Sequence, residues 1–121
     1  MIEELTTLIY DHLTELGYNL KFDTPPIEYS ENYIQFGPTY NYPKKTKSFL
    51  LGTMVTTLHF WYDYSDIRTV SKDIDNVATS CRYFPQPHNW VLNKSNSRII
   101  TDETTNKKFR HGILELEYNY F

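Results

Sequence analysis

The chain has 121 residues, of which 40% are hydrophobic and 22% charged, and this composition suits one compact domain over residues 1–121. The formal net charge of −3 argues against a general nucleic-acid binder, because such proteins bind mainly by neutralising phosphates. No apolar run approaches the roughly 20 residues that span a bilayer, so we expect no membrane segment.

Residues 2–16 predict an amphipathic helix, because apolar side chains recur at helical spacing. Glu3 and Glu4 lie in the first turn, where the helix dipole favours acids, and Gly17 is well placed to end the helix. This acidic start is unlike the basic start of a signal peptide, so we expect a mature segment. The apolar stripe consists of Ile2, Leu5, Ile9, Leu13 and Leu16.

The next segment is predicted to be extended, because Pro25 and Pro26 exclude a helix. A strand follows, for which Tyr33–Phe36 is the most strongly indicated part. Residues 38–48 are too polar and too interrupted by proline for a core element, so they predict an exposed loop or the tip of a long hairpin.

Basic and aromatic side chains gather in that predicted loop. Such a combination can contact phosphates or stack on bases, although lysines in a solvated loop are commoner and the acidic chain favours that reading. We take the loop as a candidate contact with a partner protein or another subunit. Its candidate residues are Tyr40, Tyr42, Lys44, Lys45 and Lys47.

Residues 49–62 predict the longest strand, and large side chains point both ways along it. Met54, Leu58, Phe60 and Tyr62 alternate with Val55, His59 and Trp61. A strand of a small one-layer domain normally has one wet face. We expect the set with Phe60 to pack beneath the helices and the set with Trp61 to contact a neighbouring subunit.

Residues 67–82 predict a second amphipathic helix, with Cys81 buried on its apolar stripe. Because Cys81 is the only cysteine, no intrachain disulfide is possible and synthesis in the cytoplasm is expected. Short strands are predicted at 90–92 and 98–101, with a polar turn at 93–97 between them.

The last strand, residues 109–120, alternates apolar and polar side chains from Ile113 onward. Hairpins dominate the connections. The sequence therefore predicts an α+β fold: a single, mostly antiparallel sheet of four to five strands with two helices packed on one face, in the order α-β-β-α-β-β-β.

No motif for catalysis or metal binding stands out. The histidines lack zinc-ligand spacing, and no glycine-rich phosphate loop or nucleophile elbow occurs. Glu115 and Glu117 would form an acid–base pair only within a cleft, and otherwise they are the wet face of the last strand. We expect no enzyme activity, no cofactor and no metal.

The order of these features resembles the tail terminator, or tail-completion, proteins of long-tailed bacteriophages. The resemblance rests on the extended segment TPPIEYSENYIQFG, the variable lysine loop, the long strand TTLHFWYDYSD and a last strand of the form R-H-G-x-L-x-x-x-Y at Arg110–Tyr118. Together these features run along nearly the whole chain. The segment PQPHNW departs from the pattern.

The resemblance implies a ring, usually of six copies, on the head-proximal end of the tail tube. Such a ring ends tube polymerisation and docks the tail to the head connector. Its partners would be other copies of itself, the major tail tube protein and the connector protein. Viral DNA would pass through the lumen without specific binding, and no cofactor would be needed. The protein would be made in the host cytoplasm and reside in the virion.

Two other interpretations remain open. The chain could be another neck or head-completion ring protein, or a non-viral α+β adaptor module that binds a protein partner at its sheet edge.

Overall fold

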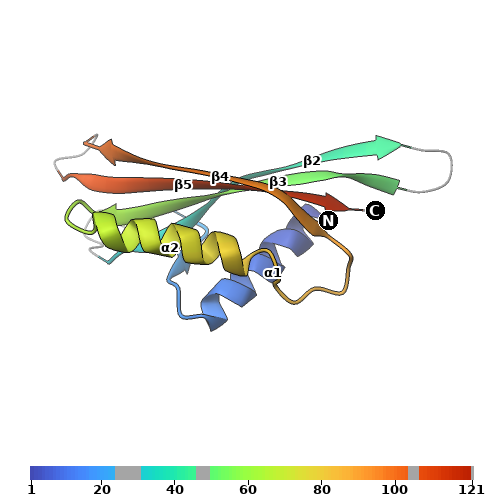
Figure 1. Ribbon diagram of the computed structural model, residues 1–121, viewed down its shortest axis with the longest axis horizontal. Coiled ribbons are helices and arrows are strands. Elements are labelled where there is room, and N and C mark those ends of the chain that lie inside the picture. The colour runs from blue at the N-terminus through green and yellow to red at the C-terminus, as the bar shows by residue number, and fades with distance from the viewer. Residues whose placement is uncertain (24–30, 46–49, 104–106, 121) are drawn as a thin grey trace.

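The computed structural model describes residues 1–23, 31–45, 50–103 and 107–120. One sheet has the strand order β1-β2-β3-β5-β4, in which β1 and β2 are parallel and the other pairs antiparallel. Both helices lie on one face of this sheet (Figure 1). The predicted α+β class, with one five-stranded sheet and two helices on one face, is therefore confirmed. The elements are α1 (Ile2–Glu15), β1 (Leu20–Lys21), β2 (Tyr33–Lys45), β3 (Leu50–Asp63), α2 (Ile67–Ser80), β4 (Val91–Asp102) and β5 (Phe109–Tyr120).

The helices form because their apolar residues recur on one side. In α1 the buried residues are Leu5, Ile9 and Leu13, each one helical turn apart. Gly17, at φ +97, follows the end of the helix, where a left-handed conformation suits glycine. Helical spacing of four and then three residues in α2 likewise buries Val70, Ile74 and Val77.

The two long central strands build the core between sheet and helices. On β3, Met54, Leu58 and Phe60 are fully buried, whereas the alternate residues are half-buried. The predicted division of this strand into two faces is confirmed. Strand β5 repeats the pattern, burying Leu114, Leu116, Tyr118 and Tyr120 beside them.

Two tyrosine hydroxyls in this core are hydrogen-bonded. The Tyr118 hydroxyl donates to the Cys81 carbonyl oxygen at 2.8 Å, and the Tyr62 hydroxyl donates to Asp73 Oδ2 at 2.5 Å. Burial raises the pKa of the Cys81 thiol to about 12, so it stays protonated and inert, as the sequence predicted.

Residues 38–48 were predicted to be an exposed loop or the tip of a long hairpin. The loop is wrong for residues 38–45, which continue β2 along β3 as far as Lys45 and so belong to a long hairpin. The register shifts by one residue between Phe36 and Thr39, so a bulge accommodates Pro38. Pro43 is tolerated because β2 is an edge strand over this stretch. Residues 46–48 lie outside the described part of the chain.

The predicted turn at 93–97 is also wrong, because β4 runs without interruption from Val91 to Asp102. Its polar residues pair with β5 in register, apart from an irregularity between Leu92 and Lys94. The two short strands predicted at 90–92 and 98–101 are thus one strand. The fifth strand is instead β1, which pairs at Leu20 and Lys21 only and lies before β2.

Candidate functional site on the open face of the sheet

The sheet face opposite the helices, here called the open face, carries the odd-numbered residues of β3. No helix in the described ranges covers it (Figure 1). Pairing fixes its neighbours, because directly opposed residues share a face: Tyr40 opposes Val55, and Trp61 opposes His111. The predicted interface residues that the structure describes, namely Tyr40, Tyr42, Lys44, Val55, His59 and Trp61, therefore share the open face.

Aromatic rings gather at one end of the open face. Trp61 stacks on His111 with ring centroids 3.8 Å apart and meets Phe109 edge-on at 6.3 Å. His59 Nδ1 and His111 Nε2 are 2.8 Å apart, so one ring donates a hydrogen bond to the other. Trp61 Nε1 donates to Gln35 Oε1 at 3.2 Å. We call Gln35, His59, Trp61, Phe109 and His111 the histidine–tryptophan cluster.

This cluster favours uncharged histidines. Burial lowers the pKa of His59 below its usual 6.5. For His111, burial is again the main cause of a lowered pKa, followed by the proximity of His59. On β4, Asp102 acts in the opposite direction and Arg98 in the same direction. The pair is therefore neutral at neutral pH, and protonating both rings would break the hydrogen bond between them.

We expect the folded state to lose stability as the pH falls below about 6.5, because the folded protein takes up these protons less readily than the unfolded chain does. Chemical denaturation at pH 7.5 and pH 5.0 measures the loss. Replacing both histidines by glutamine should flatten the profile over this range. An unchanged profile in His59→Gln/His111→Gln would show that other groups cause it.

The other end of the open face is the hairpin arm, defined here as residues 39–45 of β2 with residues 50–55 of β3. Figure 1 shows the paired ends of these strands extending past both helices. Tyr40 and Tyr42 are 52% and 58% exposed, with ring centroids 6.3 Å apart, and Lys44 is exposed beside them. From the opposite face, the Tyr120 hydroxyl donates to Asn41 Oδ1 at 2.8 Å and anchors the arm.

Two predicted lysines receive no structural account. The side chain of Lys45 and the whole of Lys47 lie outside the described part of the chain. Glu115 and Glu117 point to the open face, and Glu117 accepts a hydrogen bond from Asn93 Nδ2 at 2.8 Å, which supports the surface interpretation. In the described ranges no group of three or more His, Cys, Asp or Glu side chains could hold a metal ion.

Sequence reasoning missed His111, Phe109 and Gln35 as members of the cluster. Each sits on a strand other than β3, so the pairing register alone brings it to Trp61. The one available signal was the R-H-G motif, whose histidine lies at an outward-facing position of an alternating strand.

Comparisons with known proteins find a match in structure but none in sequence. No family model matches the chain, and no curated protein sequence matches it. A solved structure does: a chain of the "Virion of native gene transfer agent (GTA) particle" superposes with a TM-score of 0.64 at 12% identity, covering 97% of this chain and 96% of that one. The two chains share a fold. In the described ranges no helix has the length and apolar character needed to cross a membrane.

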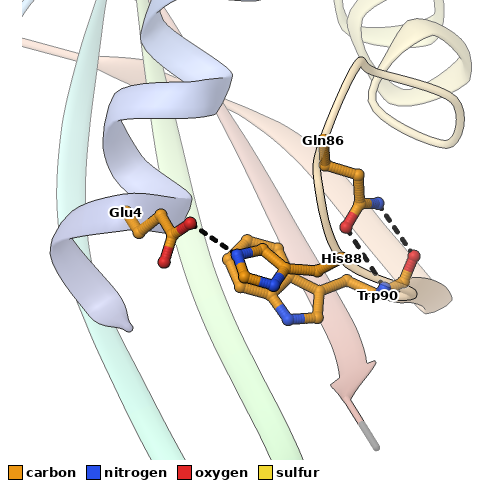
Figure 2. Close-up of polar contacts among 4 residues, drawn as sticks. All are labelled: Glu4, Gln86, His88 and Trp90. Atoms are coloured by element: carbon orange, nitrogen blue, oxygen red, sulfur yellow. Dashed lines mark hydrogen bonds and ion pairs between the residues drawn. The ribbon is translucent and has the colours of Figure 1, made fainter.

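A second polar cluster joins the α2–β4 connection to α1 (Figure 2). His88 Nε2 and Glu4 Oε1 are 2.5 Å apart, and the His88 ring stacks on Trp90 with centroids 4.3 Å apart. Gln86 donates to the Trp90 carbonyl oxygen at 2.9 Å and accepts from its backbone N–H at 3.1 Å. The PQPHNW segment thus has a structural role in holding the first helix.

We expect Glu4→Gln to lower the free energy of unfolding by less than about 1 kcal/mol, because both partners of this ion pair are substantially exposed. Trp90→Ala should cost several times more, since Trp90 is buried in the core. Urea denaturation of both variants makes the comparison. An equal loss in the two would contradict the view that burial of Trp90, rather than the ion pair, holds the connection.

Proposed function

We propose that this chain is a structural virion protein that forms a ring at the head-proximal end of a phage tail tube. The observation that carries the proposal is the shared fold with a chain of a gene transfer agent virion, which extends over nearly the full length of both chains. The order of sequence features that resembles tail terminator proteins supports the finer assignment to the tail end.

The open face supports the assembly step. It presents large rings and apolar side chains with no helix over them in the described ranges, and exposed aromatic residues are typical of protein contacts. In the proposed ring, usually of six copies, this face and the hairpin arm contact neighbouring virion proteins. Val55, His59 and Trp61 supply one part of the contact, and Tyr40 and Tyr42 with the nearby lysines supply the other.

Termination then follows from geometry. One side of the ring copies the contact surface of the major tail tube protein, and the other side does not, so the next tube ring finds no matching partner. That second side is left for the head connector protein. Viral DNA passes through the lumen without specific binding, and the mechanism needs neither catalysis nor a cofactor.

A ring elsewhere in the neck is the second candidate. The similar chain comes from a complete virion, and its printed description does not name a position within it. A neck ring would bind the connector without limiting tube length, and this difference separates the two candidates.

The test is co-expression with a major tail tube protein, followed by electron microscopy of tube length. We expect capped tubes that no longer elongate and a ring of this chain at one end. Trp61→Ala should weaken capping, whereas Tyr83→Ala, at a residue 82% exposed outside the open face, should not. Tubes that continue to elongate in the presence of the folded wild-type protein would overturn the proposal.

A further inference from the structure

The sheet has two edges without a neighbouring strand in the described ranges. Among the described residues, strand β4 pairs only with β5, along its whole length. Strand β2 pairs with β1 at Ile34 and Gln35 only, so residues 36–45 have β3 on one side and none of the described strands on the other. Edge strands present unpaired backbone N–H and C=O groups and are therefore sites where another chain can add.

The pairing register shows which backbone groups point outward. The Ile34 N–H donates to the Asn19 carbonyl oxygen, away from β3. The backbone N–H and C=O groups of successive residues point to opposite sides of a strand. Those of the odd residues of β3 therefore point toward β2, and those of the even residues toward β5. On β5, the backbone groups of the even residues then point toward β3, and those of the odd residues toward β4.

On β4 this alternation directs the backbone of four successive odd-numbered residues, from Ser95 to Thr101, out of the sheet. None of them is proline, so each offers both a donor and an acceptor. On β2, Thr39, Asn41 and Pro43 point outward in the same way, and Pro43 lacks the donor. Both edges can form a ladder, and the β4 edge is the more complete.

Strand direction selects between the possible pairings. Three antiparallel steps separate β2 from β4, so the two edge strands run in opposite directions. A neighbouring copy related by rotation about an axis along the strands keeps its strand directions. Its β2 would therefore meet β4 in the antiparallel arrangement, which is the more stable per residue.

Pairing of identical edges meets two obstacles: like charges in the β4–β4 register centred on Asn96, and a missing backbone donor on β2. Two β4 strands centred on Asn96 would place Lys94 of each copy opposite Arg98 of the other, and like charges directly opposed are destabilising. Two β2 edges would bring together two strands that both lack the donor of Pro43.

The mixed pairing places complementary side chains on the open face. Lys94 and Arg98 of β4 lie on this face, as do Tyr40 and Tyr42 of β2. All four are exposed, and a cation over a tyrosine ring is a favourable contact. A cross-copy ladder would thus be accompanied by cation–π pairs.

We propose that β4 of one copy pairs with residues 39–45 of β2 in the next copy, in a head-to-tail, antiparallel extension of the sheet. The inference rests on the proposed function only in that copies of the chain assemble. Such a contact uses two different surfaces and so generates a ring when the rotation closes. It also gives the exposed hairpin arm a partner, which is the polar β4 edge of the neighbouring copy.

Cross-linking tests the contact directly. Tyr40→Cys or Tyr42→Cys is combined with Asn96→Cys or Arg98→Cys, and mild oxidation is applied to protein assembled with its tube protein. Facing positions on paired strands lie within the Cα separation that a disulfide requires. At least one of the four pairs should give a ladder of covalent multimers. Cys81 is buried and should not form cross-links. Variants that carry only one of the two introduced cysteines control for its contribution.

A proline substitution tests the role of the outward donor. Ser97→Pro removes one outward N–H and leaves the ladder to β5 intact, so the fold should be retained by circular dichroism. Assembly, followed by light scattering, should be lost. Ser97→Thr, which keeps the N–H, should assemble like the wild type.

The outcomes separate the two proposals. Cross-linked multimers that do not cap tubes would support this contact and overturn the proposed function. Capped tubes without a cross-link in any of the four pairs, or undiminished capping by Ser97→Pro, would overturn the contact and leave the function standing. A chain that stays monomeric even with the tube protein would overturn both.

Discussion

Phe60→Ala should lower the free energy of unfolding by about 3–5 kcal/mol, the range for removing a buried aromatic side chain from a packed core. Phe60 has no exposed surface, and its ring lies 6.1 Å from that of Tyr62 within the same core. It also adjoins Gly112 on the neighbouring strand, below α2, so its removal would leave a cavity between sheet and helix. A loss of this size is a large part of the stability of a small domain.

The next residue along the strand provides the matched control. Trp61 is larger than Phe60 but lies on the open face, half-buried against His111. Trp61→Ala should therefore cost the isolated chain clearly less stability, while weakening assembly more. Urea denaturation and tube capping, measured on both variants, give the two readouts. If Trp61→Ala were the more destabilising of the two in the isolated chain, the assignment of inner and outer faces on β3 would be wrong.

The core was predictable because its signals are local. Alternation along residues 53–62 and helical spacing in 2–16 and 67–82 each reflect burial of one side of one element. The same patterns therefore appear as the buried faces of β3, α1 and α2. A periodic pattern identifies the side that is buried without any knowledge of the partner element.

The edges were not predictable for the opposite reason. Strand β4 has a run of exposed polar residues through Arg98, and β2 carries Pro38 and Pro43. Both compositions are typical of turns. They are equally typical of edge strands, which tolerate proline and favour polar side chains. Only pairing with a neighbouring strand makes them regular, and pairing is a long-range property.

The candidate site was predictable only in part. Val55, His59 and Trp61 followed from alternation on a single strand, and Tyr40 and Tyr42 joined them because β2 continues where a loop was expected. The stacking of Trp61 on a histidine 50 positions later in the chain depends on the register of β3 with β5. A shift of one residue would send that histidine to the helix-covered face.

The residue after that histidine, Gly112, lies opposite Phe60 on β3. Gly112→Ala should lower the free energy of unfolding by about 1–3 kcal/mol, as expected for overpacking a core. A Cβ at this position would lie 2.6 Å from Ile74 Cδ1 and 3.0 Å from Phe60 Cβ. The glycine thus lets α2 approach the sheet closely at β5, on the face opposite the histidine–tryptophan cluster.

A second substitution identifies the cause of that loss. Ile74→Val removes the methyl group nearest to the added Cβ, so it should recover part of the stability of Gly112→Ala although it is mildly destabilising alone. The four proteins of this double-mutant cycle are compared by urea denaturation. Strictly additive losses would mean that the helix contact is not the cause and that the strain lies against Phe60 on β3. Coupling between the two sites would instead show that the space above Gly112 sets the distance between helix and sheet.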